Sequence, residues 1–256
     1  VVGWSFDTAR KYFPHNELII NENAKNVYPG YAHNRSQYYM QIERELARGR
    51  RIDGIGFQAH FMFGEEFRQK YANPAFLDKF FDTYSEFGLS LQLTEVTIPA
   101  VFGVYDGKTF EERTAVDEEK QAAMLGRMYE YYFSLERAEA IIYWNLTDGY
   151  AWHAEPGDMT AGENVWRGGL VDFDGRRKPA YEVLNTLVNK TWRTQANVNS
   201  DKNGEARSRG FFGEYEIEAE IPAAGGSNGG AGGIKRKKFA VNFSKEEKEK
   251  EIILRF

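Results

Sequence analysis

The chain has 256 residues, of which 42% are hydrophobic and 15% aromatic, enough for one large domain or for a medium domain with a small one. Its net charge of −5 argues against a nucleic-acid partner, and the lack of cysteine excludes a disulfide framework and thiolate chemistry. No segment reaches the ~18 apolar residues of a membrane span, and none has the pattern of a signal peptide.

Hydrophobic periodicity predicts alternating helices and strands over the first 190 residues. The expected elements in chain order are a helix at 4–13, a strand at 18–20, a helix at 36–48, a strand at 52–57, a helix at 74–87, a strand at 89–93, a helix at 117–135, a strand at 140–144 and a helix at 179–189. Such β/α alternation is typical of half of a (β/α)₈ barrel or of a small open parallel sheet.

The pattern changes after Lys190, where apolar residues alternate with period two. Strands are expected near 210–221, 239–243 and 252–256, with a flexible glycine-rich loop at 225–233. The basic run 235–238 is interpreted as a solvated face and not as a phosphate-binding patch. We therefore expect two domains, residues 1–192 and a small antiparallel β appendage at 193–256.

A carboxylate ends the third expected strand. An alternating apolar segment runs from Leu91 to Glu95 and is stopped by Pro99, which predicts a buried strand with Glu95 at its C-terminal tip. Taken alone, Glu95 could equally cap a helix or pair with an arginine. Polar clusters also follow the other three strands, and this favours the barrel, whose active site is assembled from several strand tips.

The other strand tips carry side chains that suit a sugar. They present Asn21 and Glu22, Gln58 and His60, and Trp144, Asp148 and Trp152. Amides and imidazole suit sugar hydroxyls, indoles suit the apolar face of a pyranose, and a carboxylate can attack an anomeric carbon. Asp148 is interpreted as a structural anchor of its loop. No phosphate-binding loop occurs, and no metal or other cofactor is expected, since only one of four histidines lies at a tip.

Four segments in a fixed order resemble a known family. They are Ile-Asp-Gly-Ile-Gly-Phe-Gln-Ala-His at 52–60, Thr94-Glu95, Tyr-Trp-Asn-Leu-Thr-Asp at 143–148 with Trp152, and Lys-Pro-Ala-Tyr at 178–181. Over about residues 4–190 the chain resembles glycoside hydrolase family 10, the retaining endo-β-1,4-xylanases. The resemblance implies the C-terminal half, about strands five to eight, of a (β/α)₈ TIM barrel. It also implies a secreted or cell-surface enzyme of bacterial type that degrades xylan.

The resemblance implies roles for individual residues. Glu95 would be the catalytic nucleophile, and His60 would form a hydrogen bond close to it. Gln58 would contact the sugar, and Trp144 and Trp152 would line the subsites on the non-reducing side of the cleaved bond. A substrate-binding role for Asn21 is left open.

Three departures from the family pattern matter. The family's acid/base, a Glu after an Asn on the fourth strand, would lie upstream of Val1. Thr97 stands where the family has an Asp bonded to the histidine, and Asn23-Ala24 departs from the family after strand five. Glu22 is a less favoured proton donor, because the Gln-x-His strand follows it directly and marks its own strand as the fifth.

A retaining mechanism needs two carboxylates ~5–5.5 Å apart. We therefore expect a complementing N-terminal half-barrel, in the same protein or in a second chain, or two half-barrels paired in a dimer. The expected partner is xylan or a xylo-oligosaccharide. Two alternatives remain, a fragment that binds xylan without cleaving it and a related β-1,4-glucanase.

Overall fold

The computed structural model describes residues 1–22, 33–61, 73–101, 116–222, 234–245, 247 and 249–254. The residues Asn23 and Ala24, the glycine-rich loop at 225–233 and the end of the last expected strand lie outside the described residues. The chain divides into two compact units, Val1–Leu187 and Val188–Phe256, and each is considered by itself. Within the described residues, no helix has the length and apolarity to cross a membrane.

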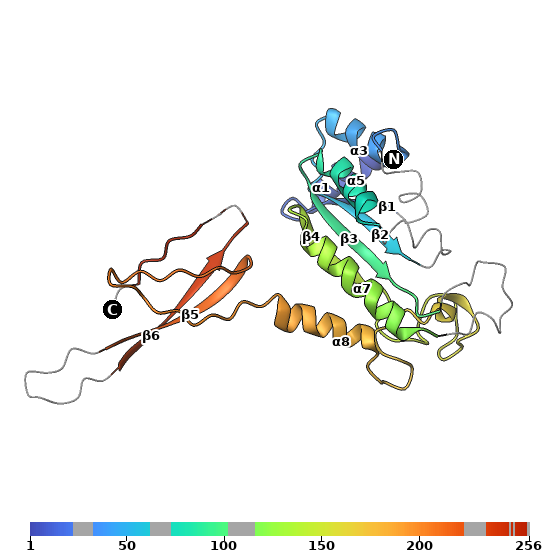
Figure 1. The fold of residues 1–256 in the computed structure, drawn as a ribbon. Coiled ribbons are helices and arrows are strands. Elements are labelled where there is room, and N and C mark those ends of the chain that lie inside the picture. The colour runs from blue at the N-terminus through green and yellow to red at the C-terminus, as the bar shows by residue number, and fades with distance from the viewer. Residues whose placement is uncertain are drawn as a thin grey trace, which may run out of the picture. The chain divides into compact units, whose positions relative to one another are not determined.

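The first unit is built on a four-stranded parallel sheet in the order β1-β2-β3-β4 (Figure 1). Its strands are β1 Ile19–Glu22, β2 Gly54–His60, β3 Ser90–Thr97 and β4 Ala138–Tyr143. Its helices are α1 Val2–Tyr12, α3 Gln37–Ala47, α5 Pro74–Ser85, α7 Glu118–Phe133 and α8 Pro179–Thr186, with a 3₁₀-helix η1 at Gly162–Trp166. The π-helix η2, Leu187–Thr191, begins at the last residue of this unit and continues into the second. The expected β/α alternation is confirmed, and sequential strands are neighbours, as in a (β/α)₈ barrel.

Side-chain caps fix where the helices begin. Ser36 accepts a hydrogen bond from the backbone N–H of Tyr39 at the start of α3 (3.1 Å). Asp117 accepts one from the N–H of Lys120 at the start of α7 (2.9 Å). Each cap satisfies a donor that the first helical turn leaves free, which is worth about 1 kcal/mol. The caps therefore fix the first residues of α3 and α7.

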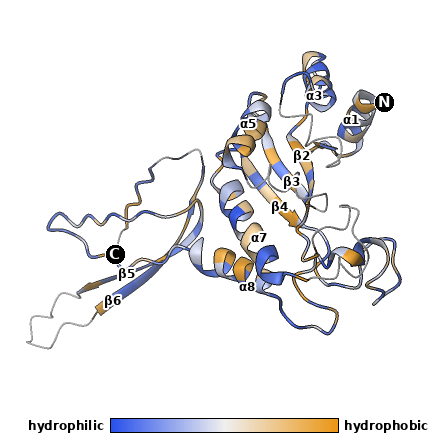
Figure 2. Cartoon of the chain, turned by 45° about the vertical axis from the view of Figure 1, so that its right-hand side comes forward, coloured by the Kyte–Doolittle hydropathy of each residue, from blue (hydrophilic) through white to orange (hydrophobic). Residues whose placement is uncertain are grey.

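An aromatic core joins the helices to one face of the sheet. Phe57 of β2 is fully buried and meets Phe80 and Tyr84 of α5 at ring-centroid distances of 5.0 Å and Tyr38 of α3 at 5.9 Å. Hydrophobic residues accordingly run along the strands (Figure 2). Because side chains alternate along a strand, Gln58 points to the opposite face from Phe57.

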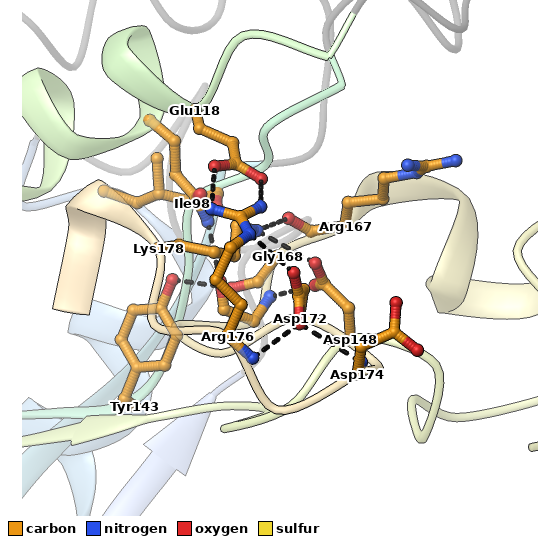
Figure 3. A network of polar contacts seen from close by, with 12 residues as sticks. Ile98, Glu118, Tyr143, Asp148, Arg167, Gly168, Asp172, Asp174, Arg176 and Lys178 are labelled. Carbon is orange, nitrogen blue, oxygen red and sulfur yellow. Dashed lines mark hydrogen bonds and ion pairs between the residues drawn. The ribbon is translucent and has the colours of Figure 1, made fainter. Parts of the chain in front are cut away.

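A buried ion pair anchors the chain that follows β4 (Figure 3). Lys178 Nζ lies 3.0 Å from Asp148 Oδ2 and donates to the Arg167 carbonyl at 2.7 Å, and both side chains are buried. The other oxygen of Asp148 accepts the backbone N–H of Gly169 at 2.7 Å. Burial lowers the pKa of Lys178, and Asp148 opposes this shift. Asp148 is therefore the loop anchor that was expected.

A second, exposed cluster adds to this anchor. Arg176 forms two hydrogen bonds to Glu118 (2.8 and 3.1 Å) and an ion pair with Asp172 (2.8 Å).

A separate, buried contact comes from β4. The Tyr143 hydroxyl donates to the carbonyl of Gly168 at 2.7 Å, and burial raises the pKa of Tyr143. These contacts tie the segment after residue 166 to α7 and to the end of β4.

Among the described residues of the second unit, β5 Gly213–Pro222 pairs antiparallel with β6 Ile234–Phe243 over ten residues. The basic run is exposed and meets glutamates of β5, with Arg236 2.7 Å from Glu220 and Lys238 2.8 Å from Glu216. This agrees with a solvated face. The prediction of a strand from Ile252 is wrong for residues 252–254, which form no strand and pair with no other strand among the described residues.

Candidate active site

A one-residue shift in strand register decides which way Glu95 points. Phe57 of β2 lies opposite Leu93 of β3, but the next residue, Gln58, lies opposite Glu95. Thr94 is thus an extra residue, the arrangement of a β-bulge. If Thr94 instead paired regularly within the strand, without a bulge, Glu95 would follow Leu91 and Leu93 to the helix-covered face. The bulge brings Glu95 beside Gln58 on the other face.

Both carboxylate oxygens of Glu95 are held by side chains of β2. Gln58 Nε2 donates to Oε1 at 2.9 Å, and His60 Nε2 lies 3.0 Å from Oε2. The Glu95 side chain is 23% exposed and that of His60 is 12% exposed, so the carboxylate is oriented yet reachable from solvent. An ionised carboxylate only accepts hydrogen bonds, so Nε2 of His60 carries the proton in this contact.

Thr97 supports His60 from behind. Its hydroxyl lies 3.1 Å from His60 Nδ1, and its side chain is almost fully buried. A Cβ added to Gly168 would lie 2.6 Å from the Thr97 methyl group, so the anchored glycine segment forms the wall against which Thr97 packs. Thr97 can donate to Nδ1 while the ring donates through Nε2 to Glu95.

Thr97→Val should lower the free energy of unfolding by about 1–3 kcal/mol, because valine keeps the shape but removes the hydroxyl partner of His60 Nδ1 in a part-buried setting. The measurement is urea denaturation. The matched control is Thr94→Val on the same strand, which removes an exposed hydrogen bond and should cost less than ~1 kcal/mol. Equal losses in the two variants would contradict the support role of Thr97.

The first predicted tryptophan joins this cluster. Trp144 directly follows β4, and its backbone N–H donates to the Val96 carbonyl at 2.8 Å. Its indole meets the His60 ring edge-on, with centroids 5.9 Å apart. The second, Trp152, is 62% exposed and packs on the ring of His153, with centroids 3.5 Å apart. The structure therefore gathers Gln58, His60, Glu95, Thr97 and Trp144, with Trp152 on the loop beyond.

Asn21 lies on the same face of the sheet as this cluster. Its Oδ1 accepts a hydrogen bond from the Thr94 hydroxyl at 2.8 Å, across the intervening strand β2. The contact passes over Gly56, where a Cβ would lie 2.7 Å from Asn21 Oδ1. The bulge residue Thr94 is thus linked to the end of β1.

Glu22 follows Asn21 and alternates to the other face. Because side chains alternate along a strand, Glu22 points to the same face as the buried Ile20, two residues before it. Tyr38 packs on the helix-covered face, where burial is the main cause that raises its pKa. The charges of Tyr84 and Glu22 raise this pKa further. Alternation along β1 thus places Glu22 toward the helix-covered face, whereas Glu95 occupies the opposite face.

One contact residue was missed from the sequence. Glu163, in η1, accepts a hydrogen bond from the Trp144 indole N–H at 2.9 Å. It lies in a loop-rich stretch without periodicity, so no sequence pattern distinguishes it. In the described ranges, no group of three or more His, Asp or Glu residues is placed to hold a metal ion.

A carboxylate held by an amide and an imidazole at parallel strand tips, beside an indole, suits the binding of a carbohydrate at the C-terminal face of a β/α barrel. The chain belongs to glycosyl hydrolase family 10, whose sequence profile matches residues 1–187. Family membership and the parallel β/α sheet confirm the expected fold, a part of a (β/α)₈ barrel with a small antiparallel sheet.

Curated relatives agree with this family. The chain is 29% identical over 187 residues to endo-1,4-beta-xylanase A of Caldicellulosiruptor saccharolyticus, covering 70% of this chain and 50% of the relative. It is 28% identical over 150 residues to endo-1,4-beta-xylanase B of Thermotoga neapolitana, covering 59% and 38%. The chain thus spans half or less of the length of these relatives.

Solved structures show the same fold. A mutant of xylanase10C from Cellvibrio japonicus, in complex with xylopentaose, superposes with a TM-score of 0.55 at 20% identity over 72% of this chain and 36% of that one. An endo-1,4-beta-xylanase from Caldicellulosiruptor owensensis gives a TM-score of 0.50 at 22% identity, covering 72% and 53%. At these identities the likeness concerns the fold alone.

Proposed function

We propose that residues 1–192 form the C-terminal half of the catalytic barrel of a retaining endo-β-1,4-xylanase, with Glu95 as its nucleophile. The observation that carries this proposal is the Glu95 carboxylate, held by Gln58 and His60 at the tip of β3 beside Trp144. Family membership and relatives named endo-1,4-beta-xylanase support xylan as the substrate.

The chemistry follows from a nucleophilic carboxylate. One oxygen of Glu95 attacks the anomeric carbon, the glycosidic C–O bond breaks, and the departing sugar oxygen takes a proton from a second carboxylic acid. Water then attacks the glycosyl–enzyme ester and gives its proton to that same group, which frees Glu95. Gln58 and His60 each hold one oxygen and so keep the carboxylate aimed without rotation.

The second carboxylate comes from barrel strands outside this chain, in the same protein or in a second chain. Glu22 alternates to the face opposite Glu95, and the Glu163 carboxylate accepts hydrogen bonds from the Trp144 indole and from Asn145. In that part of the chain, β1 and β4 each pair with one strand only, which leaves an edge where further barrel strands would join.

Sugar binding is assigned to the remaining tip residues. Trp144 and Trp152 stack on pyranose rings, and Asn21 contacts a hydroxyl group from the same face. Residues 193–256 are a separate appendage, and the enzyme works outside the cell or at its surface, where its polymeric substrate is found.

Product analysis on xylan and on cellulose tests this proposal, using the 256-residue chain with and without the complementing barrel half. We expect xylo-oligosaccharides from xylan only when both halves are present. Binding of xylohexaose with no reducing sugar released by either sample would favour the non-catalytic alternative. Release from cellulose alone would favour a β-1,4-glucanase.

A further inference from the structure

One residue of the loop after β4 contacts both tryptophans. The Glu163 carboxylate oxygen Oε2 accepts from the Trp144 indole N–H at 2.9 Å and from Asn145 Nδ2 at 3.2 Å. The backbone N–H of Glu163 donates to the Trp152 carbonyl at 2.9 Å. The side chain therefore holds one indole, and the main chain of the same residue holds the segment that carries the other.

The backbone around this residue leaves little room for adjustment. Gly162 has a φ of 52°, and a Cβ there would lie 2.4 Å from the Trp152 carbonyl oxygen and from the His153 backbone. The turn that delivers Glu163 thus packs directly against the main chain of the second tryptophan. Asn145, with a φ of 66°, is also held in the left-handed region, where its side chain reaches Glu163.

The three contacts act on different degrees of freedom. The indole N–H bond fixes the rotation of the Trp144 ring, which meets the His60 ring edge-on at an interplanar angle of 84°. The Asn145 bond fixes the backbone directly after that ring. The main-chain bond fixes where the Trp152 segment leaves the loop. Together they set the orientation of the Trp144 indole and the backbone position from which the Trp152 side chain extends.

We infer that Glu163 is a positioning residue that spaces Trp144 and Trp152 for a β-1,4-linked xylose chain. This inference rests on the proposed function of the two tryptophans as sugar platforms. A charged acceptor gives a stronger hydrogen bond to the indole N–H than a neutral one, which suits a ring that must stay aligned while partly exposed. Glu163 acts on substrate binding through the indoles and takes no part in bond cleavage.

The test compares Glu163→Ala with Glu163→Gln, which keeps an acceptor oxygen for the indole. In the assembled xylan-cleaving enzyme, Glu163→Ala should raise KM for xylohexaose about tenfold, the factor that corresponds to loss of about 1.4 kcal/mol of binding, and should leave kcat within about twofold. Glu163→Gln should recover most of the lost affinity. Glu155→Ala, which removes an exposed carboxylate from the same loop, is the matched control and should behave as wild type.

A spectroscopic measurement on the 256-residue chain is independent of turnover. The ¹H–¹⁵N signal of the Trp144 indole, assigned with Trp144→Phe, should move upfield in Glu163→Ala and stay close to its wild-type position in Glu163→Gln and Glu155→Ala. An unmoved signal in Glu163→Ala overturns the inference, whatever the activity data show.

The outcomes separate this inference from the proposed function. If Trp144→Ala weakens xylohexaose binding and Glu163→Ala does not, the sugar platform stands and the positioning role fails. If Trp144→Ala binds like the wild type, the platform itself is wrong and the inference falls with it. A fall in kcat as large as the rise in KM for Glu163→Ala would also overturn it, because a positioning residue for the indoles should act on binding.

Discussion

Glu95→Gln should lower kcat on xylohexaose at least about 10⁴-fold in the assembled enzyme, with little change in stability. Glutamine has the same shape, and its amide oxygen can still accept the hydrogen bond from Gln58. Its amide nitrogen can donate to His60 Nε2 once the imidazole takes its other tautomer. The amide cannot form the glycosyl ester that a retaining mechanism requires. The measurement is kcat on xylohexaose, with circular dichroism melting to show that the fold is kept. Near wild-type turnover in Glu95→Gln would end the assignment of the nucleophile.

Glu22→Gln is the control for this experiment. Glu22 is the last residue of β1 in the same sheet, but it alternates to the helix-covered face. It should retain kcat within a few fold. A loss in Glu22→Gln as large as in Glu95→Gln would instead identify Glu22 as the proton donor and remove the need for a carboxylate from further barrel strands.

Lys178→Met should lower the free energy of unfolding of the first unit by about 3–5 kcal/mol, the cost of leaving a buried charge without its partner. Methionine fills a similar volume, but Asp148, which is 6% exposed, loses the ammonium group 3.0 Å away, and the Arg167 carbonyl loses its donor. Urea denaturation followed by circular dichroism measures the effect.

The matched comparison is Arg176→Met, in the exposed ion cluster of the same region. Arg176 is 56% exposed, and exposed ion pairs contribute about 0–1 kcal/mol. A Lys178→Met variant no less stable than Arg176→Met would show that water reaches Asp148 and that the pair is not an anchor of the fold.

The alternation of strands and helices could be predicted because each apolar run has its own period and its own stop residue. The strand ends could not. β2 continues to His60 and β3 to Thr97, beyond the ends expected at 57 and 93, because polar residues at the tips still pair with the neighbouring strand. A change from apolar to polar residues therefore locates the candidate site, but it does not locate the last residue that pairs with the neighbouring strand.

The positions of the candidate site residues at the strand tips could also be predicted, but their orientation could not. Strict alternation from Leu91 and Leu93 would place Glu95 on the helix-covered face, and only the register with β2 shows that it turns the other way. Glu163 lies outside any periodic pattern, and its contacts depend on how a long loop returns to β4. The orientation of Glu95 and the contacts of Glu163 both depend on segments that are distant in the sequence, so the pattern of a single strand or helix cannot predict them.

The extra residue in β3 lets one strand serve two faces of the sheet. Leu93, before the bulge, points to the helix-covered face, and Glu95, two residues later, points to the opposite face beside Gln58. Deleting Thr94 would remove the bulge and its hydrogen bond to Asn21 but would leave Glu95 opposite Gln58, whereas regular pairing with Thr94 kept in the ladder would exchange the environments of Glu95 and Val96. The orientation of the carboxylate is therefore a property of the backbone path between Leu93 and Glu95, and it tolerates other side chains at position 94.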